Sequence, residues 1–231
     1  MPEPLGQPTP RSTPSPAARG APDPRRRIAA AYPGGAGLYA RLRFLIIREN
    51  ILAPMDALLP ARGRILEVGC GFGLFAGYFA ARGEGREVLG VDRDARRISL
   101  ASRMSEALGL PARFAVSDVR ALPQAERFDG AYALDVLHHV PAEHHLGVLR
   151  DVRDRLAPGA TLLVKEIATA PRLGLAFTWA LDRVMAPQDQ LSYRSPEDWL
   201  ALLAEAGFRA SARRIRDVLP YPHVLIECVR E

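Results

Sequence analysis

The sequence predicts an α/β domain in which a doubly wound, mostly parallel sheet of seven strands carries helices on both faces. Short apolar runs alternate along the chain with segments of helical periodicity, which is the pattern of βαβ units. A glycine-rich turn lies between the first such run and the helix after it. The chain has 231 residues, 48% hydrophobic and 25% charged, which is enough for one domain with a sizeable core.

The first 33 residues differ from the rest of the chain. Eight of the 20 prolines lie in the first 30 residues, together with five arginines and two acidic residues. Such a stretch buries too little apolar surface to offset its ordering entropy, so we expect a disordered Pro/Arg-rich tail over residues 1–33 and one domain over residues 34–231. The tail carries +3 of the formal net charge of +5, which leaves the domain close to neutral.

Helical periodicity begins after the tail, in residues 34–60. The apolar positions that share one face are Phe44, Ile47, Ile51, Met55 and Leu58. We expect an amphipathic N-terminal helix packed on the domain and kinked or divided at Pro54. The arginines beside it leave a weak contact with a membrane surface as an alternative.

The strands and helices of the sheet follow in order. Strands are expected at residues 64–69, 87–91, 112–116, 128–134, 161–167, 209–215 and 223–229. Helices are expected at residues 74–81, 95–108, 141–156 and 196–205, the last of them ended by Gly207.

The end of the fifth strand and the connection after it form a separate feature. Lys165 and Glu166 end that strand, where a structural ion pair is favoured over a substrate contact. Residues 168–194 then carry Phe177, Trp179 and Tyr193, and their periodicity predicts a helical lid over the substrate. An alternative is simple packing of those side chains.

The most informative motif is EVGCGFG, at residues 67–73. Glycines let the backbone turn sharply and let a ligand come close, and the helix that follows offers free N–H groups to an anionic or zwitterionic ligand. The dinucleotide fingerprint G-x-G-x-x-G/A needs Gly or Ala at the sixth position, where this chain has Leu74. A nicotinamide-dependent oxidoreductase therefore remains only an alternative.

The motif instead resembles the first motif of class I S-adenosylmethionine-dependent methyltransferases, which has the form E/D-x-G-x-G-x-G. Asp92 follows Gly73 by 19 residues and ends the second strand. Residues 117–119, 128–141 and 156–164 resemble the later motifs of that family, so residues 62–167 match it in order and spacing.

The resemblance implies a Rossmann-like sheet whose last strand is antiparallel, and S-adenosyl-L-methionine as the cofactor. In this reading Glu67 lies near the methionine amino group, Asp92 accepts from the ribose hydroxyls, Asp118 accepts from the adenine, and Asp135 lies near the methionine end or the acceptor. The residues expected to bind the cofactor are Glu67, Gly69, Cys70, Gly71, Gly73, Asp92, Ser117, Asp118, Val119 and Asp135.

Methyl transfer to a hydroxyl also needs a base. His138 and His139 lie just beyond the fourth strand, where ligands bind in this kind of sheet, and either is a candidate catalytic residue. Packing or support of the cofactor is the alternative. His144 and His145, inside the following helix, are expected to be solvated.

The predicted function is methylation of a small-molecule or lipid-like biosynthetic intermediate, with oxygen favoured over nitrogen and carbon. A nucleic-acid methyltransferase is disfavoured by the near-neutral domain and by the lack of an Asn/Asp-Pro-Pro-Tyr/Phe motif. A non-catalytic cofactor-binding regulator is a third alternative.

Two cysteines, no secretory signal and no long apolar run favour the cytoplasm, with no metal site and no transmembrane segment. The oligomeric state stays open.

Overall fold

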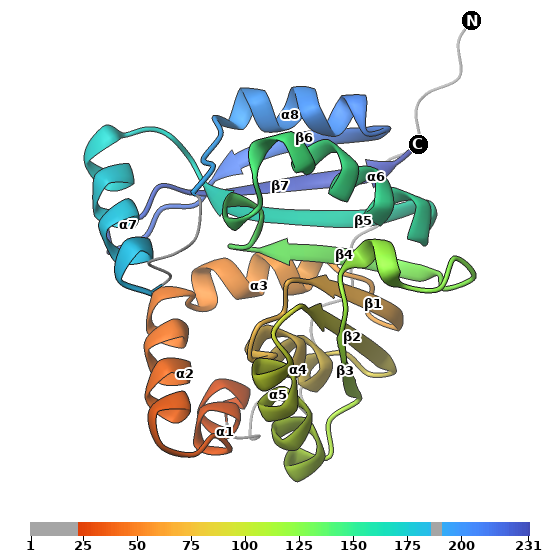
Figure 1. Ribbon diagram of the computed structural model, residues 1–231, viewed down its shortest axis with the longest axis vertical. Coiled ribbons are helices and arrows are strands. Elements are labelled where there is room, and N and C mark those ends of the chain that lie inside the picture. The colour runs from red at the N-terminus through yellow and green to blue at the C-terminus, as the bar shows by residue number, and fades with distance from the viewer. Residues whose placement is uncertain (1–22, 186–190) are drawn as a thin grey trace, which may run out of the picture.

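The computed structural model describes residues 23–185 and 191–231 (Figure 1). Its elements in chain order are α1 (Pro24–Ala30), α2 (Gly34–Ile46), α3 (Glu49–Leu58), β1 (Gly63–Val68), α4 (Leu74–Arg82), β2 (Arg86–Asp92), α5 (Ala95–Leu108), β3 (Ala112–Val116), η2 (Val119–Ala121), β4 (Phe128–Leu134), η3 (Leu137–His139), η4 (Ala142–His144), α6 (His145–Arg155), β5 (Leu156–Ile167), α7 (Arg172–Met185), α8 (Pro196–Glu205), β6 (Phe208–Arg214) and β7 (His223–Arg230). None of these described helices has the length and apolar composition needed to cross a membrane.

The strands form one sheet in the order β3-β2-β1-β4-β5-β7-β6. β1 to β5 pair in parallel, and β7 runs antiparallel to both β5 and β6. The predicted doubly wound, seven-stranded, mostly parallel sheet is therefore confirmed. The strand order reverses between β1 and β4. The connection after β1 leads to β2 on one side of this pair, and the connection after β4 leads to β5 on the other side, so the two connections diverge at the carboxyl edge of the sheet.

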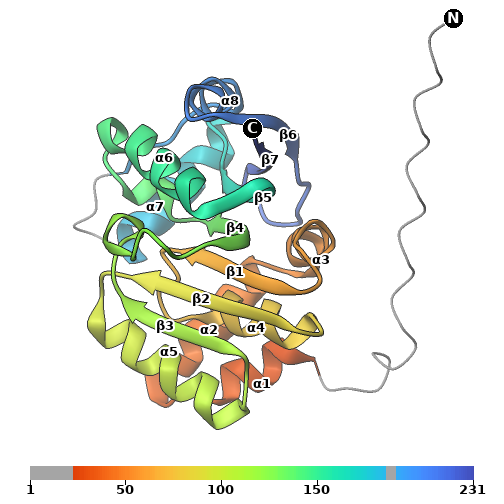
Figure 2. The ribbon, with the colours of Figure 1, turned by 90° about the vertical axis from the view of Figure 1, so that its right-hand side faces the viewer.

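Alternate side chains of each strand serve two hydrophobic cores, one on each face of the sheet. Ile65 of β1 belongs to the core shared with helices α1 to α5, whereas its neighbour Leu66 belongs to the core shared with α6 and α8. Figure 2 shows α3 and α6 on opposite sides of the strands. Both faces are covered, as a parallel sheet requires.

The N-terminal boundary differs from the prediction. Residues 24–30 form α1, which begins with a proline and is capped by the Asp23 side chain. Ile28 is 1% exposed in the core beside α4, and the Tyr32 hydroxyl donates a hydrogen bond to the Phe72 carbonyl. The disordered tail predicted over residues 1–33 is thus wrong for residues 24–33, because three apolar side chains within that stretch supply a buried face. The rest of that prediction, residues 1–22, lies outside the described residues.

The predicted helix over residues 34–60 is two helices, divided at Ile47 and Arg48 and not at Pro54. Ile47 leaves the helical region with φ −94° and ψ 87°, while Pro54 lies inside α3. A proline in a helix interior removes one backbone hydrogen bond. The completely buried Ile51, Leu52 and Met55 anchor α3 on the sheet and compensate for that loss.

Most other boundaries agree with the sequence. α5, β3, β4 and α8 have the predicted bounds, and α7 is the helix predicted within residues 168–194. The fifth strand is expected from residue 161, but β5 begins at Leu156 with a bulge, because the pairing passes from Phe128–Leu156 directly to Gly130–Thr161. Helix α6 starts later than predicted, after the short η4 turn.

Candidate active site

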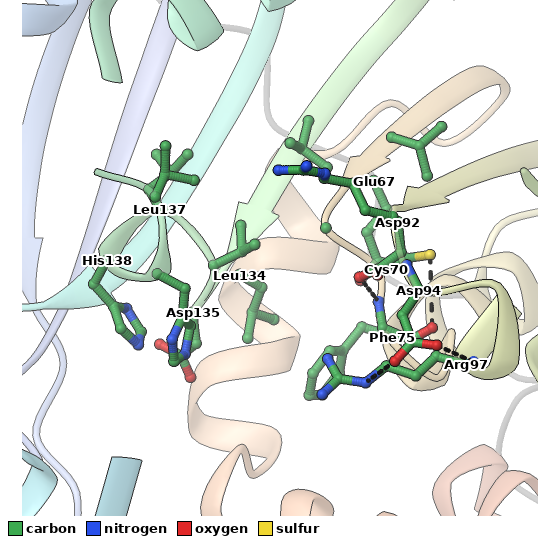
Figure 3. A pocket seen from close by; sticks show the side chains of 18 of the residues that line it. Glu67, Cys70, Phe75, Asp92, Asp94, Arg97, Leu134, Asp135, Leu137 and His138 are labelled. Carbon is green, nitrogen blue, oxygen red and sulfur yellow. Dashed lines mark hydrogen bonds and ion pairs between the residues drawn. The ribbon is translucent and has the colours of Figure 1, made fainter. Parts of the chain in front are cut away.

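A pocket of about 590 Å³ opens at the carboxyl ends of the parallel strands, where the connections after β1 and β4 diverge. Figure 3 shows Asp135, Leu137 and His138 on one side of it and Glu67, Cys70 and Asp92 across from them. The pocket brings together all but one of the predicted site residues, namely Glu67, Gly69, Cys70, Gly71, Asp92, Ser117, Asp118, Val119, Asp135, His138 and His139.

Gly73 is the predicted site residue that does not line the pocket. It has φ +72° at the N-terminus of α4, and a Cβ there would lie 2.4 Å from the Phe114 ring. Gly73 therefore shapes the turn and lets the helix pack. Gly69 has a similar constraint, because with φ +67° its Cβ would lie 2.1 Å from a Val136 methyl group. The loops after β1 and β4 are therefore in contact at Gly69 and Val136, where both begin, and Gly69 and Gly73 both require glycine.

Asp92 ends β2 and holds the glycine loop. Its Oδ2 accepts a hydrogen bond from the Gly71 N–H at 2.8 Å, and its Oδ1 accepts from the Asp94 N–H at 2.9 Å. Each carboxylate oxygen has a further lone pair, so the group can still accept from a ligand hydroxyl. Asp92 lies at the end of the second strand, where the sequence predicts the residue that binds a ribose.

The next wall comes from the turn after β3, where Ser117, Asp118 and Val119 line the pocket. Asp118 caps η2: its Oδ1 accepts from the Arg120 N–H at 2.8 Å and from the Ala121 N–H at 3.2 Å. Its Oδ2 pairs with the Arg120 guanidinium at 3.0 Å. The carboxylate that we expected to face an adenine therefore also has a local structural role.

Glu67 is the buried acid of the pocket. It is 2% exposed, and its Oε2 has no hydrogen-bond partner among the described residues. Burial raises the pKa of this carboxyl group to about 8. Cys70, beside it, is buried as well, and burial raises the pKa of its thiol, which keeps the thiol neutral.

Asp135 follows β4 and is the only described non-glycine residue with positive φ, at +51°. The Lys165 ammonium contacts its Oδ1, and the Arg43 guanidinium lies 3.3 Å from its Oδ2. Burial opposes ionisation, but these two cations outweigh it and hold the pKa of Asp135 below its usual value. The strained backbone is thus stabilised by a buried ion-pair network.

His138 forms the second buried pair. Its Nδ1 lies 2.5 Å from Glu166 Oε2, while Glu166 Oε1 accepts from the Leu137 N–H at 2.7 Å. The His139 ring lies against the His138 ring with a centroid separation of 4.2 Å. Lys165 and Glu166 are therefore both paired, although with Asp135 and His138 and not with each other.

The next two histidines differ. His144 lines the pocket, whereas His145 is completely buried, so the prediction that both are solvated is wrong for His145. The Nε2 of His145 lies within hydrogen-bond distance of two backbone carbonyl groups, which compensates for burying the ring. A buried polar ring is stable only with such partners.

Sequence reasoning missed the contribution of α2. Tyr39, Arg43 and Ile46 line the pocket, and Arg43 closes the charge network around Asp135. The arginine and the tyrosine are four residues apart, on one helical face, and that spacing could have marked them. From the predicted lid, Thr178 of α7 lines the pocket.

The donor and acceptor set of the pocket fits a zwitterionic nucleoside ligand such as S-adenosylmethionine. The unpartnered Glu67 Oε2 can accept from an ammonium group, and Asp92 has acceptor capacity for hydroxyl groups. A Cβ at Gly71 would meet no atom within 4 Å, so this stretch of backbone is open to a close neighbour. The loop lies at the N-terminus of α4, which favours the negative end of such a ligand.

Comparison with known proteins agrees with this reading. The family model described as "Methyltransferase domain" matches residues 39–212. The demethylmenaquinone methyltransferase of Thermus thermophilus is 32% identical over 175 residues, which cover 66% of this chain and 77% of that protein. A ubiquinone biosynthesis O-methyltransferase of Cereibacter sphaeroides is 30% identical over 172 residues, which cover 70% of this chain and 68% of that protein.

Solved structures show the same fold. The 1,6-didemethyltoxoflavin-N1-methyltransferase of Burkholderia thailandensis, solved with bound S-adenosylhomocysteine, superposes with a TM-score of 0.64 at 18% identity. The superposition covers 96% of this chain and 93% of that one. At this level of identity the likeness concerns the fold alone.

Proposed function

The chain belongs to the methyltransferase-domain family and is a class I S-adenosylmethionine-dependent methyltransferase, and on that premise we propose that it methylates a hydroxyl oxygen of a lipid-like biosynthetic intermediate. One relative is named a demethylmenaquinone methyltransferase, and another is named a ubiquinone biosynthesis O-methyltransferase. The observation that carries the proposal is His138, which lines the pocket and is paired with the buried Glu166, because transfer to a hydroxyl needs a base.

Four acidic residues of the pocket have distinct roles in this proposal. When bound, S-adenosylmethionine supplies an electrophilic methyl group on a positively charged sulfur. Asp92 accepts from ribose hydroxyls, Asp118 contacts the adenine, and Glu67 accepts from the amino group of the methionine moiety. Asp135, held ionised by Lys165 and Arg43 on the His138 side, lies near the methionine end or the acceptor.

The acceptor end is the side with His138. Glu166 accepts a hydrogen bond from His138 Nδ1–H, which leaves the lone pair on Nε2, the nitrogen that can take the hydroxyl proton. The fixed carboxylate also stabilises the imidazolium that this proton transfer creates. His139, which also lines the pocket, is the second candidate for this role.

Transfer of a labelled methyl group tests this proposal. The protein is incubated with methyl-labelled S-adenosylmethionine and with alkyl catechols or quinols, and the product is analysed by mass spectrometry. A labelled aryl methyl ether is the expected result. Label on carbon or nitrogen would overturn the proposed oxygen chemistry. Tight cofactor binding with no transfer to these compounds or to a lipid extract would favour the non-catalytic regulator.

A membrane surface is the proposed source of such an acceptor. Exposed apolar side chains project from α2 (Leu38, Leu42 and Leu45) and from α7 (Leu173, Phe177 and Trp179). Both helices contribute to the pocket and lie at the same end of the sheet (Figure 1). We expect Leu38→Glu with Leu45→Glu to reduce co-sedimentation with anionic vesicles, and Ala125→Glu, on an exposed loop before β4, to leave it unchanged. Equal sedimentation of all three proteins would contradict this.

We also propose that the protein works in the cytoplasm. Cys70 and Cys228 are both buried free thiols, which suits a reducing compartment. Fractionation of cells that express the full chain tests this, and recovery from the periplasmic or secreted fraction would contradict it.

A further inference from the structure

His145 is a buried histidine that does not line the pocket, yet it holds the turn that carries the proposed base. It opens α6, and its Nε2 lies 2.8 Å from the Leu137 carbonyl oxygen and 2.9 Å from the Val140 carbonyl oxygen. These two carbonyl groups flank His138 and His139 in the sequence. The ring thus fastens both ends of the turn.

The hydrogen bonds identify the tautomer of His145. A carbonyl oxygen only accepts, so Nε2 must carry the hydrogen atom. Arg194 donates from its Nε to His145 Nδ1 at 2.8 Å, and a guanidinium cannot accept in return. All three contacts are therefore satisfied only by the neutral ring with hydrogen on Nε2.

Arg194 is itself fixed in place. It donates from a terminal nitrogen to the Ala142 carbonyl at 3.0 Å, and it lies over the Trp199 ring at 5.8 Å. Trp199 in turn packs against the His145 ring, with centroids 4.9 Å apart. Burial lowers the pKa of His145 and the Arg194 charge acts in the same direction, whereas the bonds to the two carbonyls and the Glu166 charge oppose it.

We propose that Arg194 and His145 are positioning residues for methyl transfer: Arg194 selects the tautomer of His145, and His145 holds the turn so that His138 meets Glu166. This inference rests on the proposed role of His138 as the base. Other contacts also hold parts of the turn: the Ser192 N–H donates to the His138 carbonyl, and Glu166 accepts from the Val136 and Leu137 N–H groups. The His145 ring is the contact that joins the carbonyl groups on both sides of His138 and His139. Without a donor at Nε2, two carbonyl oxygens would face a ring lone pair and the turn would shift.

Nuclear magnetic resonance of the histidine side chains tests this without turnover. In the wild type we expect ring nitrogen shifts of a neutral Nε2–H tautomer for His145, and a far-downfield proton for the short His138–Glu166 contact. In Arg194→Gln and His145→Leu the downfield proton should be lost, while S-adenosylhomocysteine still binds. In His145→Gln it should persist, because the glutamine amide can donate to the two carbonyls and accept from Arg194. Arg150→Gln, on the exposed side of α6, is the matched control.

Two results would overturn the proposal. One is an Nδ1–H or charged His145 in the folded wild type at neutral pH, which needs no variant. The other is a downfield proton that persists in His145→Leu, or one that is lost in both His145→Leu and His145→Gln. A failure of methyl transfer itself would show in the labelled-methyl experiment and would leave these spectra unchanged.

Discussion

Glu166 Oε2 lies 2.5 Å from His138 Nδ1, and the other oxygen of the same carboxylate accepts from the backbone N–H of Leu137. One buried side chain on β5 therefore sets both the ring of His138 and the backbone just before it. A base fixed in this way needs no reorganisation when it takes a proton. His138 is the residue of the pocket wall with the clearest catalytic chemistry.

Glu166→Gln is expected to lower kcat by about 100-fold and to leave the affinity for S-adenosylhomocysteine unchanged. The carboxamide can donate to Nδ1, which would move the ring hydrogen to Nε2 and remove the acceptor lone pair. Single-turnover rates with the methyl acceptor check this, with Glu205→Gln on the exposed surface of α8 as the control. The double variant His138→Ala with Glu166→Gln should be no slower than His138→Ala alone. Additive losses of rate would show that the two residues act independently.

The buried Glu67 should make stability depend on pH. Its pKa is about 8 in the folded protein against 4.5 as the ordinary value, so the folded state keeps a proton that the unfolded state has lost. This contribution to stability is complete below pH 4.5 and is lost as the pH rises through 8.

Urea unfolding of wild type and Glu67→Gln across this pH range measures the effect, because the other titrating groups cancel in the difference. The wild type should lose a few kcal/mol relative to the variant between pH 4.5 and 8, at ~1.4 kcal/mol for each unit of pKa difference. Parallel stability curves for the two proteins would mean that Glu67 is ionised in the fold.

The N-terminal helix should contribute to stability. Ile28→Ala removes a side chain buried in the core beside α4 and is expected to cost about 2–4 kcal/mol. Arg26→Ala, in the same helix but exposed, should change the free energy of unfolding by less than about 0.5 kcal/mol. Chemical denaturation compares the two variants, and an equal effect of both would contradict the packing of α1.

The sheet and its site loops could be predicted from the sequence because each depends on local patterns. Strand β3 and helix α5 end where their apolar periodicity ends, and the loop containing Gly69 is recognisable by its spacing. These features need no knowledge of distant residues.

The features that could not be predicted depend on contacts between side chains that are far apart in the sequence. The burial of His145 depends on Arg194, 49 residues away, and the role of Arg43 depends on Asp135, 92 residues away. The tail boundary was missed for a related reason, since a proline- and arginine-rich composition concealed the apolar face of Ile28, Ala29 and Tyr32. Average composition does not show which few side chains meet a core.

Calorimetric titration of S-adenosylmethionine into the wild type and Asp92→Ala tests the central claim most directly. The wild type should bind one equivalent, and Asp92→Ala should bind about 10–100-fold more weakly, since hydrogen bonds to a charged group contribute ~1.5–3 kcal/mol each. Glu87→Ala, exposed on the same strand, is the control. A wild type that binds no S-adenosylmethionine, or equal affinity in Asp92→Ala, would contradict this assignment of the pocket.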